Sequence, residues 1–233
     1  MTDSLILSAF ENMFWIFRKT TGEFLTYGFS RWWYSLRWAL FAAWFGSSPN
    51  LAVLRHLKKH SPHILEQYGG LPDDCGDLTY GETLPGTAFY LIKDAELPPG
   101  STVVDLGCGR GVFPLTAAAA FGFSSVGCDI VDEYIQRGEK ASRLMGLSGK
   151  AVFKSLDFAK DKLPKGDLYF LSATCLDDDS WKKLLKNLHK TAVSGCQAVS
   201  ISRPLPGSLW QLQKRELLAF TWGKAVVYSY TRR

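Results

Sequence analysis

A glycine-rich junction constrains the fold of this chain more than any other feature. Residues 103–114, VVDLGCGRGVFP, pass from a β-branched run to a helix-forming run through Gly107, Gly109 and Gly111. Glycines at a strand-to-helix turn allow the backbone to approach a ligand closely, and the helix N-terminal amides that follow are free to bind it. The G-x-G-x-G spacing differs from the G-x-G-x-x-G of dinucleotide-binding oxidoreductases. The junction therefore predicts a βα unit that binds a cofactor.

Short apolar runs alternate with helical patterns from residue 101 onward. The strand-like runs are residues 101–106, 124–130, 151–155, 166–172 and 197–202. The helical runs are residues 110–122, 131–146 and 177–192. This alternation predicts a parallel sheet with right-handed crossovers. Residues 217–233 contain two further strand-like runs, which are joined around Trp222–Gly223 with no helix between them. This arrangement predicts an antiparallel hairpin.

The predicted fold class is therefore α/β. The core is a Rossmann-like, mostly parallel sheet of seven strands that ends in an antiparallel C-terminal hairpin. A helical N-terminal extension precedes it.

Two acidic residues flank the glycine junction. Asp105 directly precedes the turn, and Asp129 ends the next strand-like run. A carboxylate at the second position can accept hydrogen bonds from ribose hydroxyls, as in nucleotide-binding βαβ units. The glycines and both acids together form a more specific pattern than the glycines alone.

With these residues, DLGCGRG is a standard form of the first motif of class I S-adenosylmethionine-dependent methyltransferases, and residues 80–233 resemble that superfamily. The resemblance implies the class I methyltransferase fold, with S-adenosylmethionine as the cofactor. It places the loop from Asp105 to Gly111 at the methionine end of the cofactor and Asp129 at the ribose. It also implies that Asp157 binds the adenine amino group and that Phe158 lies beside the adenine ring.

The run after the fourth predicted strand distinguishes branches of this superfamily. Residues 170–181, FLSATCLDDDSW, contain neither an Asn/Asp-Pro-Pro-aromatic motif nor a Pro-Cys nucleophile, so amino methylation or cytosine C5 methylation of nucleic acid is disfavoured. Catechol-type O-methylation would require a metal cluster or an imidazole near the substrate hydroxyl. The only histidine of the domain, His189, lies in a lysine-rich helical run, and no metal site is predicted.

A second motif, TYGETL at residues 79–84, lies upstream of the first predicted strand. Together with SRPLP at residues 202–206 and the closing TWGKAVVYSYT at residues 221–231, it resembles the non-SET histone lysine methyltransferases of the telomeric-silencing-disruptor type in order and spacing. That family has a Tyr-Gly-Glu-Thr loop over the methionine moiety of the cofactor.

This second resemblance implies that Tyr80, Glu82 and Thr83 enclose the cofactor, with Tyr80 near the transferring methyl group. In the preferred hypothesis Tyr80 shapes the acceptor channel, and Ser172 and Thr174 lie at its floor. The family has an Asn pair at the end of the fourth strand, whereas this chain has Ser172 and Ala173 there. The sequence therefore does not decide which molecule accepts the methyl group.

The N-terminal part of the chain has a different composition. Residues 1–50 hold five of the eight tryptophans and fourteen of the thirty-two aromatic residues. The aromatic run 24–45 is long enough for a membrane-spanning helix, but Arg31 and Arg37 interrupt it. Its mixture of Trp, Tyr and Arg suits a helix lying in a membrane interface, and a helical cap packed on the main domain or on a partner subunit is the alternative.

The chain is therefore predicted to divide into a helical, Trp-rich extension, residues 1–77, and a methyltransferase domain, residues 78–233. The net charge is +5, and residues 151–233 carry fourteen basic and seven acidic side chains. The lysines of residues 177–192 are dispersed and not interleaved with aromatics, which disfavours a nucleic-acid partner. Five cysteines without C-x-x-C spacing and the lack of a secretory leader pattern predict a cytoplasmic protein, with membrane association left open.

Three functions fit these patterns. The first is an S-adenosylmethionine-dependent protein N-methyltransferase that acts on lysine side chains. The second is a methyltransferase for a lipid, a quinone or another apolar small molecule, delivered through residues 24–45 at a membrane surface. The third is an inactive cofactor-binding scaffold, suggested by Ser172 and Ala173 in place of the Asn pair.

Overall fold

The computed structural model describes residues 49–60 and 81–233, apart from residues 159, 173 and 175. Tyr80 and the aromatic run 24–45 lie outside the described residues. The division at residue 77 therefore stays a prediction.

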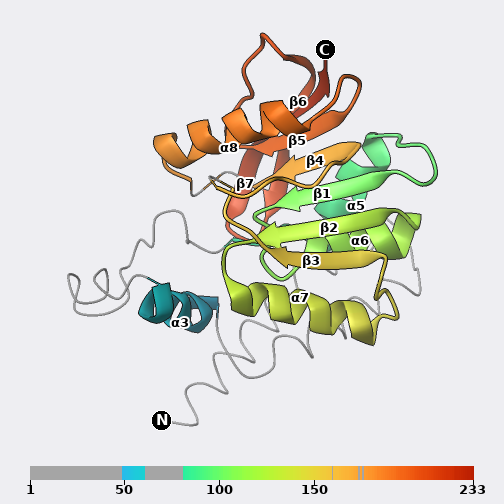
Figure 1. The fold of residues 1–233 in the computed structure, drawn as a ribbon. Coiled ribbons are helices and arrows are strands. Elements are labelled where there is room, and N and C mark those ends of the chain that lie inside the picture. The colour runs from blue at the N-terminus through green and yellow to red at the C-terminus, as the bar shows by residue number, and fades with distance from the viewer. Residues whose placement is uncertain (1–48, 61–80, 159, 173, 175) are drawn as a thin grey trace.

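A single seven-stranded sheet forms the centre of the described part of the chain, in the order β3-β2-β1-β4-β5-β7-β6 (Figure 1). The strands are β1 Thr102–Leu106, β2 Ser124–Asp129, β3 Ala151–Ser155, β4 Leu168–Leu171, β5 Gln197–Ile201, β6 Trp210–Phe220 and β7 Gly223–Arg232. Strands β1 to β5 pair in parallel, whereas β7 is antiparallel to both β5 and β6. The predicted mostly parallel sheet with an antiparallel C-terminal hairpin is confirmed.

The helices within the described residues are α3 Pro49–His60, α5 Pro85–Asp94, α6 Val112–Phe121, α7 Asp132–Leu144 and α8 Asp178–Thr191. Alternate residues of the central strands face opposite sides, as the strand period requires. Val104 and Tyr169 pack in one core cluster with Leu188 of α8. Val103 and Phe170 pack in a second cluster with α5 and α6, where the Phe113 and Phe170 rings stack at 3.9 Å. The sheet is thus covered on both faces.

Strand β6 begins at Trp210, well before the predicted start at residue 217. It is an edge strand, and charged side chains on its early residues blunt such an edge. Lys214 Nζ donates to the Tyr90 hydroxyl at 2.6 Å and to both Asp94 oxygens at 3.0 Å, and Tyr90 in turn donates to Glu216 at 2.8 Å. Because polar side chains that contact α5 occupy this part of β6, the sequence here lacks the apolar alternation that predicts a strand.

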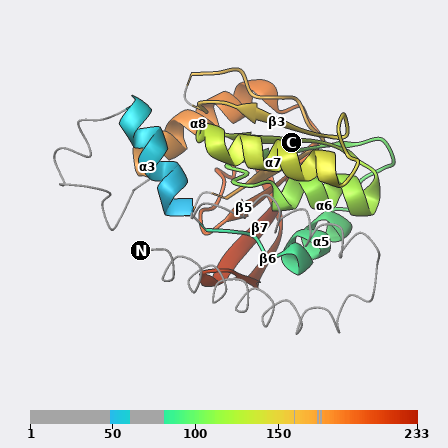
Figure 2. The same cartoon turned by 90° about the horizontal axis from the view of Figure 1, so that it is seen from below.

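Helix α3 lies beside the N-terminal end of α7 (Figure 2). Arg55 forms an ion pair with Glu133 at 2.8 Å, and Lys59 forms one with Asp132 at 3.2 Å. Asp132 also accepts a hydrogen bond from Ser155 at 2.7 Å, so this contact continues to β3. Within the part of the chain that the structure describes, no helix is long and apolar enough to cross a membrane.

The carboxyl ends of β1, β2 and β4 meet at one edge of the sheet, because Leu106 pairs with Cys128 on one side and with Leu171 on the other. The strand order reverses between β1 and β4, and in open α/β sheets ligands bind at such a switch point. The loops that follow these three strands therefore define the region of the candidate site.

Candidate active site

The loop between β1 and α6 carries the three predicted glycines, and each has a positive φ: 90° at Gly107, 51° at Gly109 and 90° at Gly111. This backbone region favours glycine because it has no Cβ. A Cβ on Gly111 would lie 2.2 Å from the Phe153 ring, so this glycine also serves packing. A Cβ on Gly107 would meet nothing closer than the Ser172 carbonyl oxygen at 3.8 Å, and this glycine lies where a ligand can approach the backbone.

Asp105 lies at the base of this loop with a side chain only 2% exposed. Its Oδ1 atom has no hydrogen-bond partner within the described part of the chain. Burial raises the pKa of Asp105 well above its ordinary value, and the nearby Asp129 carboxylate raises it further. Unpartnered buried oxygens are rare in folded proteins, so this atom marks a place where a ligand N–H group would be favourable.

Asp129, at the end of β2, is held by the backbone on both sides. Its Oδ2 accepts from the Gly109 amide at 2.9 Å, and its Oδ1 accepts from the Val131 amide at 3.0 Å. Burial raises the pKa of Asp129, and these amide hydrogen bonds oppose the shift. Each carboxylate oxygen can accept a second hydrogen bond, so Asp129 can also bind a ligand hydroxyl.

The segment after β3 lies beside Asp129, because the Leu156 amide donates to the Asp129 carbonyl oxygen at 2.9 Å. Asp157 forms an ion pair with Lys160 at 2.8 Å. Phe158 is partly buried against the core beneath α8, and its carbonyl oxygen accepts from Asn187 at 2.8 Å. The two predicted adenine-side residues thus follow the strand next to the ribose-side carboxylate.

Residues 81–84 connect the glycine loop with the C-terminal hairpin. The Glu82 amide donates to Thr221 Oγ1 at 2.9 Å, and the Thr221 amide donates to the Glu82 carbonyl oxygen at 3.1 Å. Trp222 lies directly over Gly81, where a Cβ would be 2.4 Å from the indole ring. The Glu82 carboxylate forms an ion pair with Arg110 of the glycine loop at 2.5 Å. Thr83 is buried where this segment enters α5.

The predicted acceptor-side residues follow β4. Ser172 is half-buried, and its carbonyl oxygen is the nearest atom to the open side of Gly107. Thr174 is exposed on the same loop. The structure therefore brings Ser172 to the glycine loop, whereas Thr174 faces solvent.

Comparison with known proteins identifies the family. A family model described as "Histone methylation protein DOT1" matches residues 59–206, which is well over half of the chain. The chain belongs to the DOT1 family. The resemblance to this family that the sequence predicts is confirmed.

Individual relatives of this DOT1-family chain cover only part of it. A histone-lysine N-methyltransferase, H3 lysine-79 specific, from Aspergillus fumigatus is 28% identical over 154 residues, which are 60% of this chain and 30% of that protein. Cycloartenol-C-24-methyltransferase 1 of Oryza sativa subsp. japonica is 34% identical over 100 residues, 40% of this chain and 28% of the relative. The chain thus matches about three-tenths of the length of these curated relatives.

Solved structures confirm the fold of the DOT1-family chain. An RNA methyltransferase from Salinibacter ruber in complex with S-adenosyl-L-homocysteine superposes with a TM-score of 0.53 at 21% identity, covering 62% of this chain and 89% of that one. The class I methyltransferase fold is therefore confirmed.

The described residues of this DOT1-family site fit S-adenosylmethionine. The unpartnered Asp105 oxygen and the open backbone at Gly107 lie together at the β1 end, and the Asp129 carboxylate retains acceptor capacity one strand away. Asp105, Gly107 and Glu82 would hold the methionine end, Asp129 the ribose, and Asp157 with Phe158 the adenine. Tyr80, which would complete the methionine end, lies outside the described residues.

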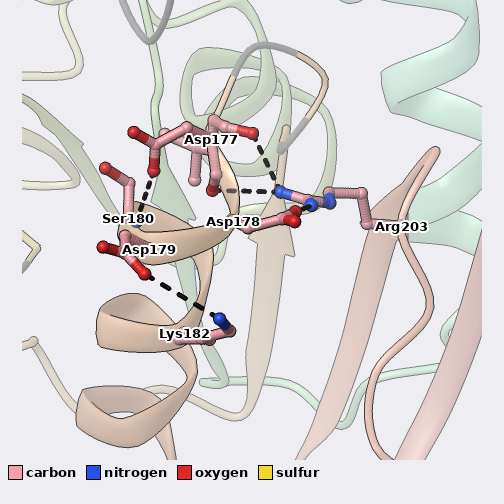
Figure 3. Close-up of polar contacts among 7 residues, drawn as sticks. Asp177, Asp178, Asp179, Ser180, Lys182 and Arg203 are labelled. Atoms are coloured by element: carbon pink, nitrogen blue, oxygen red, sulfur yellow. Dashed lines mark hydrogen bonds and ion pairs between the residues drawn. The ribbon is translucent and has the colours of Figure 1, made fainter.

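Two arginines of this DOT1-family chain were missed from the sequence. Arg110 lies inside the glycine motif, and its positive charge beside the acid Asp105 was the available signal. Arg203, in the loop after β5, donates to the carbonyl oxygens of Leu176 at 2.8 Å and Asp177 at 3.1 Å and pairs with the Asp178 carboxylate (Figure 3). Arg203 thereby joins the loops after β4 and β5 on the acceptor side.

The same close-up shows why α8 begins where it does. Asp177 caps the helix, because its Oδ1 accepts from the Ser180 amide at 2.6 Å (Figure 3). The Arg203 guanidinium also lies 5.5 Å from the centre of the Trp181 ring, which is within the range of a cation–π interaction. The loop that carries Ser172 and Thr174 is thus fixed at its far end.

Proposed function

We propose that this chain transfers a methyl group from S-adenosylmethionine to the side-chain amine of a lysine in a protein. The observation that carries the proposal is the junction of Glu82, Thr221 and Arg110. It joins the TYGETL segment to the closing hairpin and to the glycine loop. These are the segments on which the resemblance to lysine methyltransferases rests, and membership in the DOT1 family supports the same acceptor.

S-adenosylmethionine supplies an electrophilic methyl group when it is bound. The residues of the chain contribute position and exclusion of water, because a lysine amine must be uncharged and aligned for attack. Trp222 stacks on Phe220 at 4.7 Å between ring centres and covers Gly81, which gives an aromatic surface beside the methionine end. Ser172 borders the glycine loop from the end of the neighbouring strand β4, and Tyr80 would close the channel. The lysine proton leaves to solvent before the amine enters this surface.

We also propose a cytoplasmic location, with peripheral contact to a membrane through the Trp-rich run 24–45. The mixture of aromatic and basic residues in that run supports this proposal. An apolar small molecule is the second candidate acceptor, and the match to a cycloartenol methyltransferase over 100 residues is the observation that favours it.

The decisive experiment offers both acceptor classes at once. The purified full chain is incubated with methyl-labelled S-adenosylmethionine and a cell lysate, which is then separated into protein, lipid and nucleic-acid fractions. We expect the label in protein, as methyl-lysine by mass spectrometry. Label confined to the organic phase would replace the lysine proposal with the apolar one, and cofactor binding without label in any fraction would indicate an inactive scaffold.

Two variants control this experiment. Asp129→Ala removes the predicted ribose acceptor and should abolish labelling. Glu139→Ala changes an exposed carboxylate on α7 that pairs loosely with Arg143 at 3.8 Å, and it should label as the wild type does. Equal labelling by the wild type and Asp129→Ala would exclude the assigned cofactor site.

A further inference from the structure

Arg110 is a charged residue of the glycine loop that is almost completely buried. Its side chain is only 1% exposed, and it ranks among the largest fully buried side chains of the described residues. Its Nη2 atom lies 2.5 Å from Oε2 of Glu82, whose side chain is 13% exposed. A buried cation is tolerated only when it is paired and hydrogen-bonded, so the two side chains depend on each other.

Glu82 belongs to the 81–84 segment, which also contacts the C-terminal hairpin. Its backbone is bonded to Thr221 in both directions, and Trp222 covers the neighbouring Gly81. Those contacts fix the segment to the β6–β7 turn, which is distant in sequence from the glycine loop. The ion pair with Arg110 connects the segment to the loop that carries Gly107 and Gly111.

We propose that Arg110 is a positioning residue for the cofactor, which acts by fixing the Glu82 carboxylate and the 81–84 segment against the glycine loop before the cofactor binds. This inference rests on the proposed function only in assigning the site to S-adenosylmethionine. If the 81–84 segment is already ordered, cofactor binding does not have to pay the entropy cost of ordering it. The preorganised segment should therefore raise the affinity for the cofactor. Arg110 itself touches Glu82, and its effect on the cofactor passes through that residue.

A second buried arginine provides a matched control. Arg137 of α7 pairs with Glu133 at 2.5 Å, with side chains 7% and 21% exposed. The two ion pairs have the same N–O distance, Glu133 has Arg55 as a second partner at 2.8 Å, and only the Arg110 pair connects two segments of the candidate site. If the role of Arg110 is purely structural, Arg110→Met should lower the unfolding temperature, as Arg137→Met does, and should leave the affinity for S-adenosylhomocysteine unchanged.

The test measures binding of S-adenosylhomocysteine by calorimetry, together with thermal unfolding of the ligand-free protein. We expect both methionine variants to lower the unfolding temperature, and only Arg110→Met to weaken binding, by about tenfold, which corresponds to roughly 1.4 kcal/mol. Once the methyl acceptor has been identified, Arg110→Met should raise the KM for S-adenosylmethionine and change kcat at saturation by less than about threefold. The lost contact contributes equally to the bound ground state and to the transition state.

A double-mutant cycle tests whether Arg110 acts through Glu82. In the Glu82→Gln background, Arg110→Met should change the dissociation constant less than about twofold, because the carboxylate that Arg110 positions is gone. The double variant removes both charges and so avoids an unpaired buried ion, which keeps the cycle usable if Arg110→Met alone does not fold. Arg110→Lys keeps the charge and should recover part of the affinity.

Three outcomes would overturn the proposal. Wild-type affinity in Arg110→Met would make the ion pair merely structural, and additive effects in the cycle would mean that Arg110 contacts the cofactor directly. A wild-type chain that does not bind S-adenosylhomocysteine would remove both this inference and the proposed function. If the wild type binds it and Arg110 behaves as expected but no lysine is methylated, only the acceptor assignment fails.

Discussion

Replacing Gly111 with alanine adds one methyl group to the glycine loop, and the structure defines what that group would meet. Gly111 has a φ of 90° and precedes the first turn of α6. Its added Cβ would lie 2.2 Å from one carbon of the Phe153 ring and 2.4 Å from the next. Cβ additions at Gly127 and Gly138 would approach the same ring to 2.8 and 2.5 Å, so the ring has little room to retreat.

The expected cost has two parts. Alanine in the left-handed region loses about 1–2 kcal/mol of stability. Forcing a methyl group into a packed site costs about 1–3 kcal/mol more. Gly100 separates these parts, because its φ is 87° and a Cβ there would meet nothing within 4 Å. We therefore expect Gly100→Ala to lose only the backbone part and Gly111→Ala to lose both, about 2–5 kcal/mol in total.

Urea and thermal unfolding of the ligand-free variants measure this difference. In a domain of this size each kcal/mol should lower Tm by about 2–4 °C. The cost of Gly111→Ala should also shrink in a Phe153→Leu background, where the ring carbons it strikes are missing. Equal losses for Gly111→Ala and Gly100→Ala would refute the packing role assigned to Gly111.

Three further predictions concern charge and the cofactor segment. Because burial raises the pKa of Asp105, the folded state keeps a proton that the unfolded chain releases, and wild-type stability falls as pH rises from the ordinary Asp range towards the raised pKa. Asp105→Asn should remove this fall. The free energy of unfolding from urea titrations at about pH 5 and about pH 8 should therefore rise for the variant relative to the wild type at the higher pH. Arg55→Gln breaks a partly exposed pair with Glu133 worth about 0.2–1 kcal/mol, so hydrogen exchange in α3 should accelerate while global unfolding barely moves; unchanged exchange would mean that the pair does not hold the helix. Glu82→Ala and Tyr80→Phe should each reduce methylation by about tenfold or more, the loss typical of a displaced positioning group, and full labelling by either would show that the TYGETL segment is misassigned.

The sheet could be predicted because its signals are local. Each strand has its own β-branched or apolar run, the glycines directly follow the first strand, and an acid lies near the end of each of the first two strands, and the structure reproduces these features. The start of β6 was missed because Lys214 and Glu216 satisfy their charges on α5, which no local pattern reveals. A polar run of this kind is compatible with an edge strand, where charged side chains are common.

The candidate site was predictable only in part. The Asp129 contacts follow from the βαβ geometry, whereas the bonds between Glu82 and Thr221 join residues 139 apart. Only the resemblance to a family linked those two segments. Arg110 was overlooked because a charged residue in a loop is normally solvated, and its burial depends on a partner from a separate motif.

The position of β7 has a consequence for how the site is completed during synthesis. β7 follows β6 in the chain but lies between β5 and β6, and within the described residues β6 pairs with no other strand. A nascent chain that has emerged only as far as residue 222 therefore has its glycine loop but no place for β6 in the sheet. Thr221 and Trp222 can reach Glu82 and Gly81 only after β7 has been inserted. The contacts that the hairpin makes with Glu82 and Gly81 are therefore completed last, once residues 223–232 have paired with β5.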